Sequence, residues 1–111
     1  MHFCFTGQYT PQSLNAILDN PTMNRYEVAK KLIEAAGGKL HGFYGMFGQE
    51  YGLAMIVEAP SHAEYIGAII PAVAAGTFES YKTVPLYTAA DVTKAIAVSK
   101  KVAEVYRPPM G

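Results

Sequence analysis

The sequence predicts an α+β domain in which two strand–helix–strand units build a four-stranded antiparallel sheet, with an extra helix at the C-terminus. Three observations support this fold class. Residues 37–60 have the pattern of two adjacent strands joined by a tight, glycine-containing turn. Segments with helical spacing of apolar residues flank this pair on both sides. A further strand lies beyond each helix, so the predicted order is strand, helix, strand, strand, helix, strand.

The first strand and helix occupy the N-terminal third of the chain. Residues 2–9 alternate between aromatic and small or polar side chains, as in a strand. Residues 10–11 (Thr-Pro) supply an N-cap and a proline at the first helical position. Residues 20–21 (Asn-Pro) interrupt the helix, because proline cannot donate the helical hydrogen bond, and helical spacing resumes near residue 22. Residues 37–38 (Gly-Gly) then end it with a left-handed cap.

The rest of the chain completes the sheet and adds a last helix. Ser61 with Glu64, and Thr88 with Asp91, have the spacing of capping boxes at helix starts. The order is that of the ferredoxin-like split βαβ arrangement, with helices on one side of the sheet. We treat residues 1–111 as a single domain with these further elements: strands at 39–47 and 51–58, a helix at 61–76, a strand at 77–87, a helix at about 88–106 and a short tail at 107–111.

Composition narrows the class of protein. Half of the 111 residues are hydrophobic and 16% are charged, which is enough apolar material for a packed core. Nine basic residues balance nine acidic ones, so we expect neither a nucleic-acid partner nor a membrane partner. Cys4 is the only cysteine and cannot form an internal disulfide. With no recognisable signal peptide and no long apolar run, the sequence predicts a cytoplasmic protein.

The central strands carry apolar side chains on both faces. Simple alternation gives two opposed sets, namely His41, Phe43 and Phe47 against Leu40, Tyr44 and Met46 in one strand, and Leu53, Met55 and Val57 against Ala54, Ile56 and Glu58 in the next. A sheet that is apolar on both faces needs a second covering layer. The chain has no spare element of sufficient size, so we expect a second copy to cover it in a homodimer or higher oligomer.

Several motifs resemble the GYD-domain family of the dimeric α/β-barrel superfamily. The most specific are residues 37–40 (Gly-Gly-Lys-Leu) and 57–60 (Val-Glu-Ala-Pro), and the resemblance extends over roughly residues 3–96. The family usually has a Gly-x-Tyr-Asp turn. Here residues 48–52 read Gly-Gln-Glu-Tyr-Gly, with one extra residue and glycine in place of the aspartate. The resemblance implies a ligand held between the sheet and its helices or loops. It implies no particular reaction, because neighbouring families include monooxygenases, isomerases and haem-binding enzymes.

His41 is the strongest candidate for chemistry, because an imidazole among apolar strand residues needs a partner. It is either a hydrogen-bonded structural histidine or a general base, with Tyr44 or Tyr81 orienting an oxyanion. Strand parity also places His2, Glu58 and Glu79 on its face, a set of residues that can bind a metal. No HxH or HxxxH spacing supports such a site, so we predict no metal and no cofactor.

Three functions are consistent with these residues. The favoured one is a binding protein that holds a small apolar or aromatic molecule in a cleft beside the sheet. The second is a cofactor-independent enzyme of the monooxygenase or isomerase type with His41 as its base. The third is a purely structural assembly subunit. The predicted ligand-binding residues are Tyr9, Phe43, Tyr51, Glu58 and Glu79.

Overall fold

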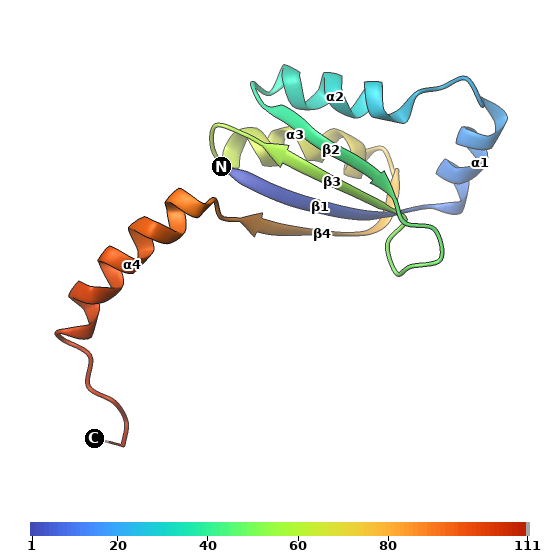
Figure 1. Cartoon of the computed structure of the whole chain (residues 1–111). Helices are drawn as coiled ribbons and strands as arrows, with labels where there is room; N and C mark the ends of the chain where they lie inside the picture. Colours follow the sequence, from blue (N-terminus) through green and yellow to red (C-terminus); the bar gives the residue numbers. More distant parts are fainter. Residues whose placement is uncertain (111) are drawn as a thin grey trace.

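The computed structural model describes residues 1–110. Its elements, in chain order, are β1 (His2–Tyr9), α1 (Pro11–Asp19), α2 (Arg25–Ala35), β2 (Lys39–Gly45), β3 (Leu53–Glu58), α3 (His62–Ala74), β4 (Phe78–Leu86) and α4 (Ala89–Ala103). The sheet order is β2-β3-β1-β4, and all neighbouring strands are antiparallel. Helices α2 and α3 lie over one face of the sheet (Figure 1). This is the ferredoxin-like α+β fold that the sequence predicts.

Local signals in the sequence explain where the first helices begin and end. The Thr10 hydroxyl accepts a hydrogen bond from the Ser13 amide at 3.1 Å, which caps α1. Helix α2 begins at Arg25, three residues later than predicted, because the Asn24 side chain caps it by accepting from the Glu27 amide at 3.2 Å. Gly37 ends this segment at a φ of 82°, which is the left-handed conformation that favours glycine.

Two capping boxes were predicted, and one of them forms. At α4 the Thr88 and Asp91 side chains each accept a hydrogen bond from the other residue's backbone N–H group. At α3 the prediction is wrong, because the Ser61 hydroxyl donates to the Glu64 carboxylate and accepts from no backbone N–H group. Other boundaries differ slightly, since β2 ends at Gly45, β3 starts at Leu53 and α4 ends at Ala103.

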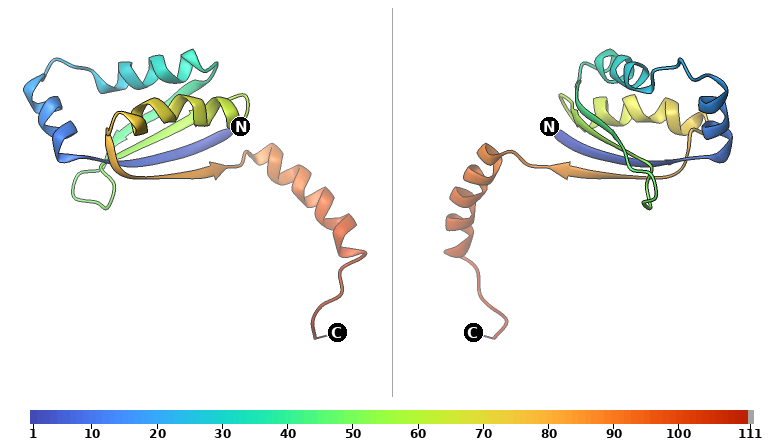
Figure 2. Two further views of the ribbon diagram at one scale, coloured as in Figure 1. Left: turned by 180° about the vertical axis from the view of Figure 1, so that it is seen from behind. Right: turned by 45° about the vertical axis from the view of Figure 1, so that its right-hand side comes forward.

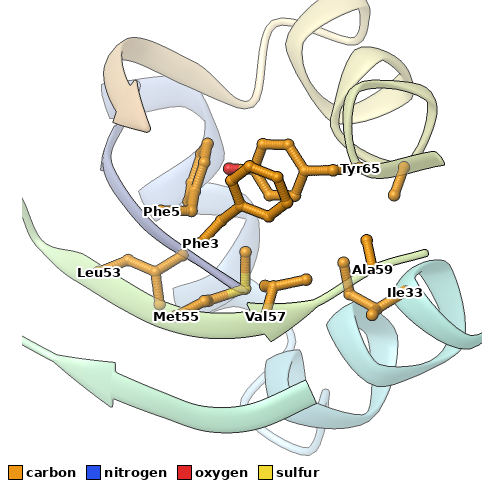
Figure 3. Close-up of a cluster of buried hydrophobic side chains, with 9 residues drawn as sticks. Phe3, Phe5, Ile33, Leu53, Met55, Val57, Ala59 and Tyr65 are labelled. Atoms are coloured by element: carbon orange, nitrogen blue, oxygen red, sulfur yellow. The ribbon is translucent and has the colours of Figure 1, made fainter. Parts of the chain in front are cut away.

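The hydrophobic core lies between the sheet and the α2–α3 layer (Figure 3). Alternate residues of β1 and β3 point into it, and Phe5 and Val57 are fully buried. Ile33 from α2 and Tyr65 from α3 complete the contact from the helix side. The Tyr65 hydroxyl is 2.7 Å from the Thr83 hydroxyl of β4, so the polar end of this core ring is hydrogen-bonded.

Strand β2 contains an irregularity that changes which side chains share a face. Its register against β3 shifts between Leu40 and Gly42, so one extra residue lies opposite β3. Leu40 and Phe43 both pack against the core, whereas His41 contacts Glu58 on the other side of the sheet. The predicted grouping of His41 with Phe43 is therefore wrong, because strict alternation does not hold across a bulge.

The second face of the sheet, here called the open face, has no covering layer within residues 1–110. Helix α4 points away from the sheet and contains no buried residue (Figures 1 and 2). Cys4 and Ile56 are half-buried on this face, and Val84 is exposed. The apolar character that the sequence suggested for this face is present in part, since Thr6 and Lys82 also lie on it, and its coverage by a second copy stays a prediction.

Candidate functional site

A groove opens on the helix-covered side of the sheet, where α1, the start of α2 and the β2–β3 loop meet. Its volume is ≈ 280 Å³. A smaller inner cavity of ≈ 40 Å³, between the sheet and the α2–α3 layer, shares part of its wall. The residues common to both are Tyr9, Arg25, Phe43 and Leu53. A ligand in the groove would therefore reach the edge of the core.

The groove wall is mostly apolar and partly aromatic. Leu14 and Ile17 of α1 form one side, and Phe47 of the β2–β3 loop contributes on the other. Tyr9 enters at the end of β1, where the pairing with β4 shifts register, and its ring stacks on Phe78 with the ring centroids 5.4 Å apart. Such a wall suits a flat apolar ligand.

Arg25 places the one guanidinium of the groove wall among these side chains. Its Cζ atom lies 5.9 Å from the centroid of the Tyr9 ring. Its Nε atom is buried and has no hydrogen-bond partner among residues 1–110. Its Nη1 atom makes only a weak contact of 3.8 Å with the Met23 sulfur. A buried donor without a partner is costly, so this atom points to an acceptor that the chain itself does not supply.

A second cluster lies on the open face, at the opposite end of the sheet from the groove. We call it the histidine cluster, and it consists of His2 of β1, His41 of β2 and Glu58 of β3. The His41 Nε2 atom is 2.8 Å from the Glu58 Oε1 atom, and the His2 Nε2 atom is 3.6 Å from the same oxygen. The imidazole rings of the two histidines stack with centroids 5.9 Å apart.

The histidine cluster changes the titration of its carboxyl group. The hydrogen bond from His41 is the main cause that holds the pKa of the Glu58 carboxyl below its ordinary value. Desolvation opposes this lowering, while the positive charges of His2, His41 and the N-terminus add to it. Glu58 is therefore ionised over a wider pH range than a free glutamate, and it stays available as an acceptor or ligand.

The structure brings together only some of the predicted site residues. Tyr9 and Phe43 meet in the groove, and His41 and Glu58 meet in the histidine cluster. Glu79 lies near the start of β4, whereas His2 pairs with Leu86 at its end, so the predicted grouping of Glu79 with His41 is wrong. The prediction for Glu79 failed because the alternation of a strand gives the face of a residue and not its position along the strand.

Three of the four predicted tyrosines lie outside the groove. Tyr44 is on the open face and 60% exposed. Tyr81 lines a separate hollow of ≈ 270 Å³ between β4 and α3. Tyr51 precedes β3 in the β2–β3 loop and does not line the groove. Tyr81 and Tyr51 therefore lie away from His41, whereas Tyr44 shares its strand and its face.

Sequence reasoning missed Arg25, which is the most distinctive residue of the groove. A signal for it was present, because Arg25 is the first residue of α2. Acidic residues are favoured at that end of a helix and basic ones are disfavoured by the helix dipole. Helix stability therefore does not explain a basic residue at this position.

Comparison with known proteins places the fold. The GYD-domain family model matches residues 3–96, so the chain belongs to the GYD-domain family. A solved structure with the same fold is that of 5-chloro-2-hydroxyhydroquinone dehydrochlorinase from Burkholderia phenoliruptrix, in complex with 2,5-dihydroxybenzoquinone. The two are 21% identical with a TM-score of 0.56, over 78% of this chain and 94% of that chain. A comparison with curated proteins gave no match.

No helix within residues 1–110 combines the length and the apolar character needed to cross a bilayer.

Proposed function

We propose that this protein binds a small aromatic or quinone-like molecule with an ionisable oxygen in the groove beside Tyr9, Arg25 and Phe43. The observation that carries the proposal is Arg25, whose side chain lines an apolar groove and whose buried Nε atom has no partner among residues 1–110. An oxyanion on the ligand would pair with this guanidinium.

The size and lining of the groove limit the ligand. A volume of ≈ 280 Å³ is close to the lower limit of about 300 Å³ for small-molecule sites, so it suits one or two rings. The aromatic rings of Tyr9 and Phe43 favour a flat molecule. The dehydrochlorinase with the same fold is in complex with 2,5-dihydroxybenzoquinone, a one-ring molecule with hydroxyl groups, which supports this ligand class.

Titration calorimetry with 2,5-dihydroxybenzoquinone tests the proposal. We expect the Arg25→Gln variant to bind it about 10- to 100-fold more weakly, because a hydrogen bond to a charged group contributes about 1.5–3 kcal/mol. The dimethyl ether of the same quinone has no ionisable oxygen and should bind both proteins equally.

The chain offers a matched control in Arg107, its other arginine, which is exposed after α4. Arg107→Gln should bind both quinones like the wild type. Equal affinity of wild type and Arg25→Gln for the dihydroxyquinone would contradict the role of Arg25, and failure of the wild type to bind either quinone would contradict the ligand class.

The enzyme alternative rests on a different observation. Glu58 accepts a hydrogen bond from His41, and a carboxylate in this position can orient an imidazole as a general base. His41 lines neither the groove nor the hollow beside Tyr81. Catalysis by His41, with Tyr44 or Tyr81 assisting, would therefore require a substrate on the open face. This alternative and the structural-subunit alternative have weaker support than ligand binding.

We also propose that two copies pair through the open face. Its support is the apolar set of Cys4, Ile56 and Val84, which no element within residues 1–110 covers. Native mass spectrometry of the full chain should then show a dimer, and Ile56→Lys should convert it to a monomer. Ile66→Lys changes an exposed residue on α3 and should leave the dimer intact. The cytoplasmic location stays a prediction.

A further inference from the structure

We propose that the histidine cluster is a binding site for a divalent transition metal ion, with His2, His41 and Glu58 as its three protein ligands. The site is separate from the groove, since it lies on the other face of the sheet and at the other end of β1. Two imidazoles and one carboxylate are ligands that suit Zn²⁺ and its neighbours Co²⁺ and Ni²⁺ rather than Mg²⁺ or Ca²⁺.

The distances between the ligand atoms fit one ion. One atom from each residue lies within 4.8 Å of the other two. Zinc binds nitrogen and oxygen at about 2.0–2.2 Å, so two ligand atoms of a tetrahedral site are about 3.3 Å apart. The Glu58 Oε1 atom is 2.8 Å from the His41 nitrogen and 3.6 Å from the His2 nitrogen. These two distances lie on either side of the expected separation. Small rotations of the side chains would complete the geometry.

The backbone holds the three residues in place without the ion. Each comes from a different strand, and His2 lies between two partners, opposite Glu58 of β3 and Leu86 of β4. The chain before His2 is fixed as well, because the Ala59 amide donates to the Met1 carbonyl at 2.8 Å. The bulge in β2 turns His41 to the same side. Little ordering would therefore be needed on binding.

The site is accessible and leaves room for a further ligand. In the single chain the side chains of His2, His41 and Glu58 are 32%, 36% and 46% exposed, so an ion can reach them before two copies pair. Three protein ligands leave the fourth position of a tetrahedral ion for water or a bound molecule, as in catalytic rather than structural zinc sites. Motif spacing such as HxH cannot detect this site, because its ligands come from three separate strands, although strand parity placed the three residues on one face.

Cobalt(II) is the most direct probe, because a tetrahedral site gives it strong visible absorption. We expect the full chain, freed of metal with a chelator, to bind one Co²⁺ per chain with a dissociation constant below about 1 µM. Zn²⁺ should displace the cobalt and remove the absorption. His41→Ala and His2→Gln should each weaken binding by at least about 100-fold.

The third histidine of the chain is the matched control. His62 begins α3 on the covered side and packs edge-on against Phe3, with centroids 5.6 Å apart. His62→Ala should bind Co²⁺ like the wild type. The proposal is overturned if wild-type protein gives no tetrahedral cobalt spectrum, or if His62→Ala loses as much affinity as His41→Ala.

A measurement on the wild type guards against variants that fail to fold. In an NMR spectrum, bound Zn²⁺, which is diamagnetic, should shift the imidazole signals of His2 and His41 and leave those of His62 nearly unchanged. The same experiment on Arg25→Gln should give the same result, because Arg25 belongs to the groove. Equal effects on all three histidines would show weak surface binding and would contradict the proposal.

Discussion

The two faces of this sheet use neighbouring residues of the same strands for different purposes. In β1, Phe3 and Phe5 point to the covered face and are buried, while His2 and Cys4 point to the open face and stay partly exposed. The covered face holds the core. The open face carries titratable groups close together at little cost to that core. The comparison teaches that stability and reactive chemistry are separated here by the alternation of a strand.

The largest expected difference between the faces is in unfolding free energy. Phe5→Ala removes a fully buried ring and should cost about 3–5 kcal/mol. Ile56→Ala on the open face removes a half-buried side chain and should cost clearly less. Urea unfolding at low protein concentration measures both. Comparable losses for the two variants would mean that the open face is buried in solution.

A smaller difference concerns tyrosine hydroxyls on the two faces. The pKa of Tyr65 is raised mainly by burial, and its hydroxyl is bonded to Thr83. Tyr65→Phe should cost about 0.5–1.5 kcal/mol, the usual contribution of one hydrogen bond. Tyr44→Phe alters an exposed ring and should leave the unfolding midpoint unchanged. If both variants behave alike, the Tyr65–Thr83 contact does not stabilise the fold.

On the open face, we expect the ionisation of the Glu58 carboxyl group to make stability depend on pH. Because the pKa of Glu58 is lower in the folded chain than its ordinary value of 4.5, ionised Glu58 favours the folded state above that pH. This contribution is lost as the pH falls through the lowered pKa. Carboxyl-detected NMR should give a midpoint below 4.5 for metal-free protein, and His41→Gln should raise it. A midpoint that is the same with and without His41 would contradict the assigned cause.

The smallest effect is expected from α4, which belongs to neither face. Its helix has no buried residue, so Val98→Ala should change the unfolding free energy by less than about 0.5 kcal/mol. A chain ending at Tyr87 should keep nearly the same thermal midpoint. A large loss on truncation would show that α4 packs against a surface in solution, such as the open face of a second copy.

The order of elements could be predicted because short local signals mark their ends. The Thr10 cap, the Asn20-Pro21 break and the Gly37 turn are each readable from a few adjacent residues, and the structure shows all three. The position of the bulge at His41 could not be predicted, because the residues around it fit unbroken alternation equally well. The face on which a residue lies after a bulge depends on how the strand pairs with its neighbour. The sequence of one strand does not contain that information.

The candidate sites were predictable only in part. Tyr9 and Phe43 were expected as ligand contacts because aromatic residues are common in such sites, and both line the groove. Glu79 was grouped with His41 by parity, although strand register separates them. Arg25 was missed because its significance lies in what surrounds it, namely an apolar wall without a carboxylate. The burial of the Arg25 Nε atom and its lack of a hydrogen-bond partner depend on the three-dimensional structure.

The outward course of α4 gives the molecule an extended outline. The chain measures 62 Å along its longest axis, and its radius of gyration of 18.3 Å exceeds the value of about 13 Å for a compact domain of this length. Small-angle X-ray scattering would therefore distinguish an α4 that extends away from the sheet from one that packs against it. The position of α4 could then be followed in solution while a quinone or a metal ion is added.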